Sequence, residues 1–179
     1  VSMPSATKKL IIFTDIGDTI IDECTEVRDQ THTVVQASCI PGARETYLEL
    51  FRRGYPIVMV ADGTVQSFSN TMAQNGLAHI FAARIISEAV GEGKPSEKMF
   101  RAAMDALHLS EQDKGRVIMI GNSVKRDILG ANRFGIRSVL MDWSTLRPYD
   151  EAGPLEHATY RIHAPEELLP LVEQLEKVL

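Results

Sequence analysis

The sequence predicts a single α/β domain, built on a doubly wound, Rossmann-like parallel sheet with helices on both faces. Two observations lead to this fold class. Short apolar runs alternate with segments of helical apolar period, which is typical of parallel strands buried on both faces and joined by helices. A polar residue also follows each run, and ligands of such sheets bind beyond the carboxyl ends of the strands. A chain of 179 residues is long enough for one domain with its own core.

The first half of the chain predicts three strands and two helices. The run LIIFT at 10–14 is too short for a buried helix and rich in Ile, so it predicts a strand. Segment 41–54 predicts a helix, because Pro41 stands near its start and Gly54 at its end. The remaining elements are a buried strand at 56–60, a helix closed by glycine at 66–76, and a short strand at 83–87.

The second half continues the alternation. Segment 95–109 predicts a helix whose apolar face carries Met99, Ala102, Ala103, Ala106 and Leu107. A strand at 116–120, a helix at about 125–134, a strand at 138–141 and a short extended piece at 160–162 follow. The last predicted helix covers about 166–178, with Leu168, Leu171, Val172 and Leu175 on one face. The polar residues that follow the five main strands are Asp15, Asp62, Glu88, Asn122 and Asp142.

Composition excludes several classes of function. The formal charge of −5 argues against a nucleic-acid partner, because binding phosphate backbones requires clustered Lys and Arg. No stretch approaches the roughly 20 apolar residues that span a bilayer, so no membrane partner is expected. Residues 1–9 lack the apolar core of a signal peptide and are expected to be disordered. Cys24 and Cys39 have no metal-ligand spacing and are expected to be reduced thiols in the cytoplasm.

Three motifs carry the candidate chemistry. The segment IIFTDIGDTI places Asp15 at the end of a buried strand, GKPSEKMF begins a helix near Lys94, and VIMIGNSVKRDILGANRFGI places Asn122 and Asp127 after the fourth strand. In this order the motifs resemble those of the haloacid dehalogenase-like (HAD) hydrolases, from about residue 10 to residue 141. The combination of the Lys-Pro pair with the third motif is specific, whereas each motif alone is weak.

This resemblance implies a Mg²⁺-dependent phosphohydrolase that acts on a phosphorylated substrate through an aspartyl-phosphate on Asp15. It implies that Lys94 adds positive charge between Asp15 and the phosphoryl group, where negative charge develops. The implied metal ligands are Asp15, the backbone carbonyl of Gly17, Asp127 and Asn122. The implied substrate-binding residues are Ile16, Gly17, Asp18 and Thr19 in the first turn and Ala61, Asp62 and Gly63 after the second strand.

The sequence departs from the family pattern at three positions. Phosphatases of the family usually carry a general acid two residues after the nucleophile, where this chain has Gly17. Asp18 stands one position later, and residues three apart in an extended chain do not share a side. Ala61 replaces a hydroxyl residue, and Asn122 removes one negative charge near the cation. We therefore expect weakened general acid catalysis, with a catalytically degenerate binding or scaffold domain as the alternative.

The chain has no room for a cap domain. Residues 21–40 predict a short flap that contains Glu23, Glu26, Arg28, Asp29 and His32. Because such a flap leaves the site open, we expect either a bulky or polymeric substrate or a second subunit to cover it, the latter making the protein a homo-oligomer. Carbon–halogen hydrolysis is a third hypothesis, but burying an apolar substrate would require the missing cap.

Overall fold

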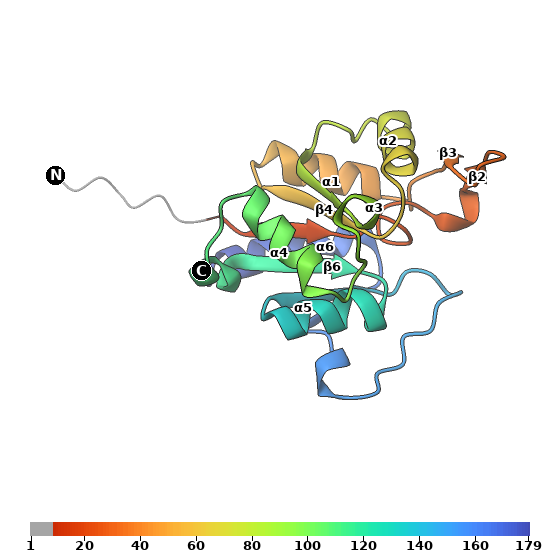
Figure 1. Cartoon of the computed structure of the whole chain (residues 1–179). Helices are drawn as coiled ribbons and strands as arrows, with labels where there is room; N and C mark the ends of the chain where they lie inside the picture. The colour runs from red at the N-terminus through yellow and green to blue at the C-terminus, as the bar shows by residue number, and fades with distance from the viewer. Residues whose placement is uncertain (1–8) are drawn as a thin grey trace.

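The computed structural model describes residues 9–179 and is built on a six-stranded sheet (Figure 1). Every neighbouring pair of strands is parallel. The order across the sheet is β5 (Phe81–Ile86), β4 (Ile57–Ala61), β1 (Ile11–Thr14), β6 (Val117–Gly121), β7 (Arg137–Met141) and β8 (Tyr160–Ile162). The chain runs outward from β1 to β5 and then returns to β6 on the other side of β1. The strand order therefore reverses between β1 and β6, where doubly wound sheets bind ligands.

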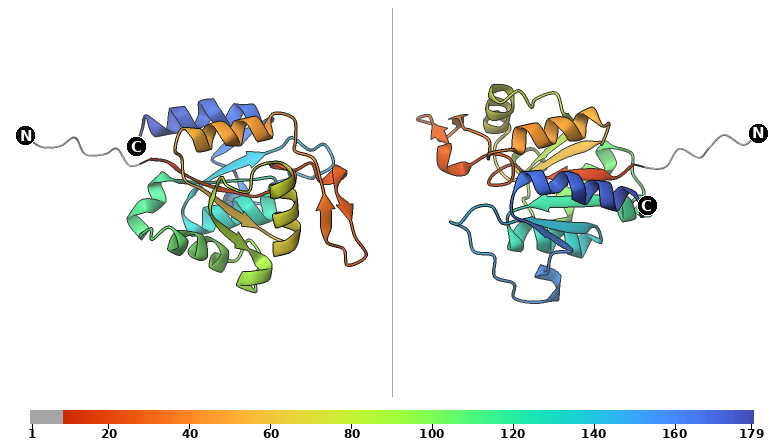
Figure 2. Two further views of the ribbon diagram at one scale, coloured as in Figure 1. Left: turned by 90° about the horizontal axis from the view of Figure 1, so that it is seen from above. Right: turned by 180° about the vertical axis from the view of Figure 1, so that it is seen from behind.

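Helices cover both faces of the sheet, as the sequence predicted. Figure 2 shows α1 and α6 side by side on one face, with α4 and α5 on the other. The helices are α1 (Ala43–Arg52), α2 (Val65–Gln74), the short α3 (Ser87–Val90), α4 (Glu97–Ala106), α5 (Leu129–Phe134) and α6 (Leu168–Glu176). Single turns of 3₁₀ helix lie at Glu23–Thr25, Pro154–Glu156 and Pro165–Glu167, a longer one at Glu111–Arg116, and a π-helical turn at Val124–Ile128.

Alternation along β1 divides the core into two layers. Leu10 and Ile12 pack with the buried side chains of α1 and α6, whereas Ile11 and Phe13 pack with those of α4 and α5. Successive side chains of a strand point to opposite faces. The next residue in phase with Phe13 is Asp15, so the alternation directs its carboxylate toward the face that α4 covers. Lys94 lies just before α4 on this face.

Most predicted elements are confirmed, with shifted boundaries. The third strand begins at Phe81 rather than at residue 83, and the segment that follows adds a short helix, α3, that was not predicted. The predicted helix at 125–134 consists of a π-helical turn followed by α5. On α4 the predicted apolar face was partly wrong, because Phe100 and Met104 are buried while Ala106 is exposed. The larger side chains determine the packing, since they bury more apolar surface.

The predicted flap contains a small antiparallel hairpin, formed by β2 (Val27–Arg28) and β3 (Val34–Gln36). The hairpin projects beyond the sheet next to α2 (Figure 2). The disorder expected for residues 1–9 lies outside the described residues, except at Lys9, whose ammonium group donates to the carbonyl of Arg53 at 2.7 Å. Among the described helices, none is both long and apolar enough to cross a membrane.

Candidate active site

The site is centred on Asp15, immediately after β1. Its backbone N–H donates to the carbonyl of Ile120 at 2.8 Å, which ties it to the neighbouring strand β6. The carboxylate is 15% exposed and lines a cavity at the carboxyl end of the sheet. Asp15 therefore stands at the point where the strand order reverses, with its side chain accessible to a ligand.

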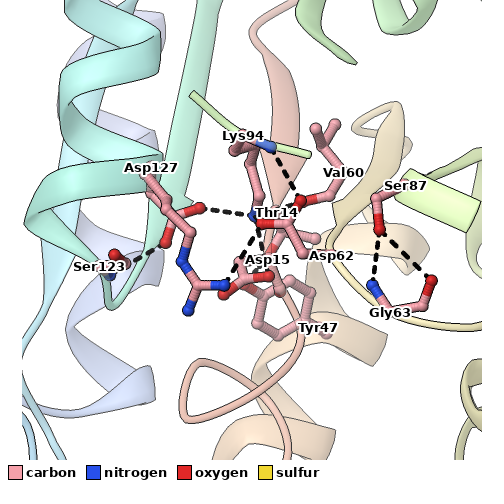
Figure 3. A network of polar contacts seen from close by, with 11 residues as sticks. Thr14, Asp15, Tyr47, Val60, Asp62, Gly63, Ser87, Lys94, Ser123 and Asp127 are labelled. Atoms are coloured by element: carbon pink, nitrogen blue, oxygen red, sulfur yellow. Dashed lines mark hydrogen bonds and ion pairs between the residues drawn. The ribbon is translucent and has the colours of Figure 1, made fainter. Parts of the chain in front are cut away.

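Lys94 connects Asp15 to Asp127 (Figure 3). Its ammonium group donates to Asp15 Oδ1 at 2.9 Å, to Asp127 Oδ1 at 2.6 Å and to the carbonyl of Val60 at 2.8 Å. The two carboxylate oxygens that share this nitrogen can therefore lie at most about 5.5 Å apart, the sum of the two distances. Asp15 and Asp127, which are far apart in the sequence, are thus on the same side of the sheet and close together.

Electrostatics at this cluster leave an excess of negative charge. Asp62 Oδ2 lies 3.9 Å from the Lys94 ammonium group, so three carboxylates surround one buried cation. Burial alone lowers the pKa of Lys94, but Asp127, Asp15 and Asp62 outweigh burial and raise that pKa above its usual value. Burial, together with the nearby charge of Asp15, raises the pKa of Asp127 to about 6. Lys94 is therefore fixed in its charged form, and a further cation would relieve the repulsion between the carboxylates.

Asp127 is positioned by the π-helical turn and by a glycine that the sequence analysis missed. Its Oδ2 accepts from the backbone N–H of Ser123 at 3.0 Å, and its side chain is 1% exposed. A Cβ atom on Gly121 would lie 2.2 Å from Asp127 Cγ, so only glycine fits at the end of β6. A glycine inside a strand run often marks such a close approach, and the run VIMIG contained this signal.

Asp62 shapes the opposite side of the site. Its Oδ1 accepts from the backbone N–H of Lys94 at 2.8 Å and thereby fixes the entry to α4. The N–H of Gly63 donates to Ser87 Oγ at 2.9 Å, so this amide already has a partner. Ala61 is fully buried and has no hydroxyl group to donate. The end of β4 thus contributes a carboxylate to the cavity, whereas Ala61 offers no hydroxyl group and the N–H of Gly63 is engaged by Ser87.

Most of the site residues named from the sequence come together. Those that line the cavity are Asp15, Ile16, Gly17, Asp62, Gly63 and Asn122. Lys94 contacts Asp15 directly, and Asp127 is linked to Asp15 through the ammonium group of Lys94. Asp18, Thr19 and Ala61 do not line the cavity, and their side chains are buried. Glu88 and Asp142, which also follow strands, serve elsewhere: Glu88 accepts from the N–H of Val65 at the start of α2, and Asp142 pairs with Arg161 and His163.

The flap forms a fixed wall of the cavity rather than a loose cover. Its residues Glu23, Glu26, Arg28, His32 and Val34 line the cavity together with α2. The N–H of Val34 donates to Ser67 Oγ at 3.0 Å, and Asn70 Nδ2 donates to the carbonyl of Val34 at 2.9 Å. Two further bonds of this kind join Ala37 to Gln74 and Asn75.

Arg147, in the segment between β7 and β8, is a second residue that the sequence did not reveal. Its Nε donates to Asp18 Oδ2 at 2.9 Å, and its guanidinium group also pairs with Glu23. Asp18 Oδ1 in turn accepts from the backbone N–H of Glu23 at 3.0 Å. The Asp18 carboxylate, 4% exposed, is therefore occupied in holding the first turn to the flap and to Arg147.

The donors present fit a divalent cation of the Mg²⁺ type. Asp15, Gly17 and Asn122 line one cavity, and Asp127 lies behind Asp15, so carboxylate, amide and backbone carbonyl oxygens are available, as Mg²⁺ prefers. Within residues 9–179 no group of three or more His, Cys, Asp or Glu side chains could hold a metal ion. The four ligands named above do not form such a group, because only two of them are carboxylates and the others are an amide oxygen and a main-chain oxygen.

Comparisons with known proteins give the class of this molecule. The model of the haloacid dehalogenase-like hydrolase family matches residues 9–135, which is more than half of the chain. The chain therefore belongs to the haloacid dehalogenase-like hydrolases. Phosphoserine phosphatase of Thermus thermophilus is 34% identical over 115 residues, covering 64% of this chain and 45% of that protein. Glyceraldehyde 3-phosphate phosphatase of Pyrococcus furiosus is 31% identical over 138 residues, covering 77% of this chain and 55% of that protein. The chain thus spans about half the length of these relatives.

Solved structures share the fold. A protein from Listeria monocytogenes serotype 4b superposes with a TM-score of 0.75 at 19% identity, covering 94% of this chain and 99% of that chain. A HAD phosphatase from Thermococcus onnurineus superposes with a TM-score of 0.65 at 24% identity, covering 76% of this chain and 59% of that chain. The doubly wound fold predicted from the sequence is confirmed by these likenesses.

Proposed function

We propose that the chain is a Mg²⁺-dependent phosphohydrolase that forms an aspartyl-phosphate on Asp15. The observation that carries the proposal is the convergence of Asp15 and Asp127 on the buried ammonium group of Lys94. The names of relatives support the substrate class, since they describe phosphatases and a pyrimidine 5'-nucleotidase. The substrate we propose is a phosphomonoester whose phosphoryl group lies in the cavity beside Asp15.

The chemistry follows from the positions of the side chains. Asp15 attacks phosphorus, the bond to the leaving oxygen breaks, and water later cleaves the acyl phosphate, so that one difficult displacement becomes two easier ones. Lys94 donates to Asp15 and offsets the charge of the phosphoryl group. Position 17 offers no acid of its own, and the loss of a general acid typically costs about 10²–10⁴-fold in rate. We therefore propose that general acid catalysis is weaker than with an acid at position 17, so that activated leaving groups react faster than alkoxides.

Asp15, Asp127, Asn122 and the carbonyl of Gly17 would hold Mg²⁺. When bound, the cation would neutralise charge between the Asp15 carboxylate and the incoming phosphate. Asn122 would contribute an amide oxygen where a carboxylate would bind more strongly. We therefore propose a weaker affinity for Mg²⁺ than a three-carboxylate site would have.

A catalytically degenerate binding domain is the second candidate. The observations that favour it lie at the end of β4, where Ala61 has no hydroxyl group and the N–H of Gly63 is engaged by Ser87. With fewer donors for phosphoryl oxygens, the site would bind a phosphorylated group without turning it over.

Binding of beryllofluoride with Mg²⁺, measured together with phosphate release, distinguishes the two candidates, because this ion mimics the phosphoryl group on an aspartate. Calorimetry on the wild type should show Mg²⁺-dependent binding, and Asp15→Asn should abolish it. Asp142→Asn is the matched control, because Asp142 also follows a strand but pairs with Arg161 and His163. Failure of the wild type to bind beryllofluoride or release phosphate from any phosphomonoester would refute the phosphohydrolase.

A further inference from the structure

The side chain of Glu23 occupies the space that a side chain at position 17 would fill. A Cβ atom on Gly17 would lie 1.9 Å from Glu23 Oε1 and 2.8 Å from Glu23 Cδ, so a side chain at position 17 would force Glu23 to move. The backbone of Gly17 does not have a positive φ angle, so an L-residue is not excluded by conformation. What a side chain there would meet is the carboxylate of Glu23.

Glu23 reaches this place from the flap and is held there by contacts on its other side. It begins the 3₁₀ turn Glu23–Thr25, and its backbone N–H donates to Asp18 Oδ1 at 3.0 Å. Arg147 pairs with Glu23 Oε2 and, through a second nitrogen, with Asp18. No hydrogen bond within the described residues engages Glu23 Oε1, which is the oxygen nearest Gly17. One oxygen is thus anchored, and the other remains available in the cavity that Asp15 also lines.

The other acids of the cavity are less suited to proton transfer. Asp62 accepts from the backbone N–H of Lys94, and Glu26 is paired with Arg28 on the flap. Asp18 in the first turn does not line the cavity, and its buried carboxylate is paired with Arg147. The Glu23 side chain is 36% exposed, so water screens its pairing with Arg147.

We propose that Glu23 is the general acid and base of this site, supplied by the flap in place of an acid at position 17. This inference rests on the proposed phosphohydrolase function and adds a catalytic residue to it. Glu23 lies four residues past the first turn in the sequence, but its carboxylate lies against Gly17, two positions from the nucleophile.

Over the two chemical steps Glu23 donates one proton and recovers one. As Asp15 forms its bond to phosphorus, the P–O bond to the leaving group breaks, and the leaving oxygen takes the electron pair and a proton from Glu23. The Glu23 carboxylate then removes a proton from water, and the water oxygen attacks phosphorus. The bond between phosphorus and Asp15 breaks, its electron pair returns to the Asp15 carboxylate, and inorganic phosphate leaves. Glu23 ends protonated, as it began.

The test compares a poor and a good leaving group. An alkyl phosphate needs the proton from an acid, whereas nitrophenolate departs without one. Glu23→Gln should therefore raise the ratio of nitrophenyl to alkyl phosphate turnover at least about tenfold, since general acids contribute about 10²–10⁴-fold. Asp29→Asn, which removes a flap carboxylate that does not line the cavity, should keep the wild-type ratio, and thermal melting should verify that both variants fold.

Moving the carboxylate from position 23 to position 17 separates a catalytic role of Glu23 from a structural one. Gly17→Asp combined with Glu23→Ala moves the carboxylate to position 17 and removes the clash between the two side chains. This double variant should recover alkyl phosphate turnover relative to Glu23→Ala alone. If Glu23 only fills space, Glu23→Gln will leave the substrate ratio unchanged, and this inference is overturned while phosphatase activity stands. If the wild type hydrolyses neither substrate, the proposed function fails and the role of Glu23 fails with it.

Discussion

Gly121→Ala tests whether the close approach between β6 and Asp127 is essential. The added methyl group would lie 2.2 Å from Asp127 Cγ and Oδ2, which is far inside ordinary van der Waals contact. Neither partner can easily move away. Gly121 lies in β6 and pairs with Leu140 of β7, and Asp127 is held by Lys94 and by the N–H of Ser123.

The expected cost follows from these restraints. Overpacking of a close-packed interior costs about 1–3 kcal/mol. Displacing the Asp127 carboxylate from Lys94 would add up to about 3 kcal/mol, because a hydrogen bond between charged groups is lost. For a chain of this length, each kcal/mol lowers Tm by roughly 2–4 °C. The total of about 1–6 kcal/mol means that Gly121→Ala should unfold about 2–24 °C earlier, and it should bind Mg²⁺ more weakly.

Urea denaturation and Mg²⁺ titration measure the two effects separately. Gly115→Ala is the matched control, because a Cβ on Gly115 would meet nothing within 4 Å and its φ angle is not positive. That variant should be neutral or gain up to about 1 kcal/mol by restricting the unfolded chain. Equal stability and equal Mg²⁺ affinity of the Gly121→Ala variant and the wild type would refute the steric argument.

Three further predictions concern the charges of the site. Lys94→Met should lower the free energy of unfolding by about 3–5 kcal/mol near pH 7.5 without Mg²⁺, since Asp127 then remains buried and unpaired, and added Mg²⁺ should restore part of the loss in a denaturation assay. The pKa of Asp127 is raised to about 6 in the folded protein, so the folded state binds more protons than the unfolded state between about pH 4 and 6. The contribution of Asp127 to the free energy of unfolding should therefore fall by roughly 3 kcal/mol as the pH rises through that window. Asp127→Asn should remove this component from a pH series of urea denaturations, whereas an unchanged pH profile would contradict it. Arg147→Ala should lower turnover of an alkyl phosphate more than that of nitrophenyl phosphate, because Glu23 loses its anchor; an equal loss on both would indicate a purely structural role.

The strands and the strand-end carboxylates could be predicted because their signals are local. The run LIIFT is apolar at every position, and alternation then fixes the side on which Asp15 emerges. The order of motifs along the chain was enough to associate Lys94 and Asp127 with Asp15. Apolar periodicity was less reliable on α4, where Phe100 stacks on Phe134 and turns the helix face away from Ala106.

Contacts between distant segments could not be predicted from the sequence. Arg147 meets Asp18 across 129 positions, and nothing in the residues around Arg147 indicates that partner. The position of Glu23 over Gly17 depends on how the flap folds back after the first turn. The departure at position 17 therefore looked like a loss in the sequence, whereas the fold places another carboxylate at the same point in space.

The flap also limits how a substrate can enter. Four hydrogen bonds between side chains of α2 or its C-terminal cap and the flap backbone hold it in place. Each contributes about 0.5–1.5 kcal/mol, so lifting the flap would cost about 2–6 kcal/mol before any packing is lost. This cost favours a standing wall over a lid that opens in each catalytic cycle. A substrate would then enter from the solvent side of the cavity, where the half-exposed Arg126 lies 3.7 Å from Asp62. The part of the substrate beyond the phosphoryl group would remain outside the wall, which is how a bulky molecule could be accommodated without a cap.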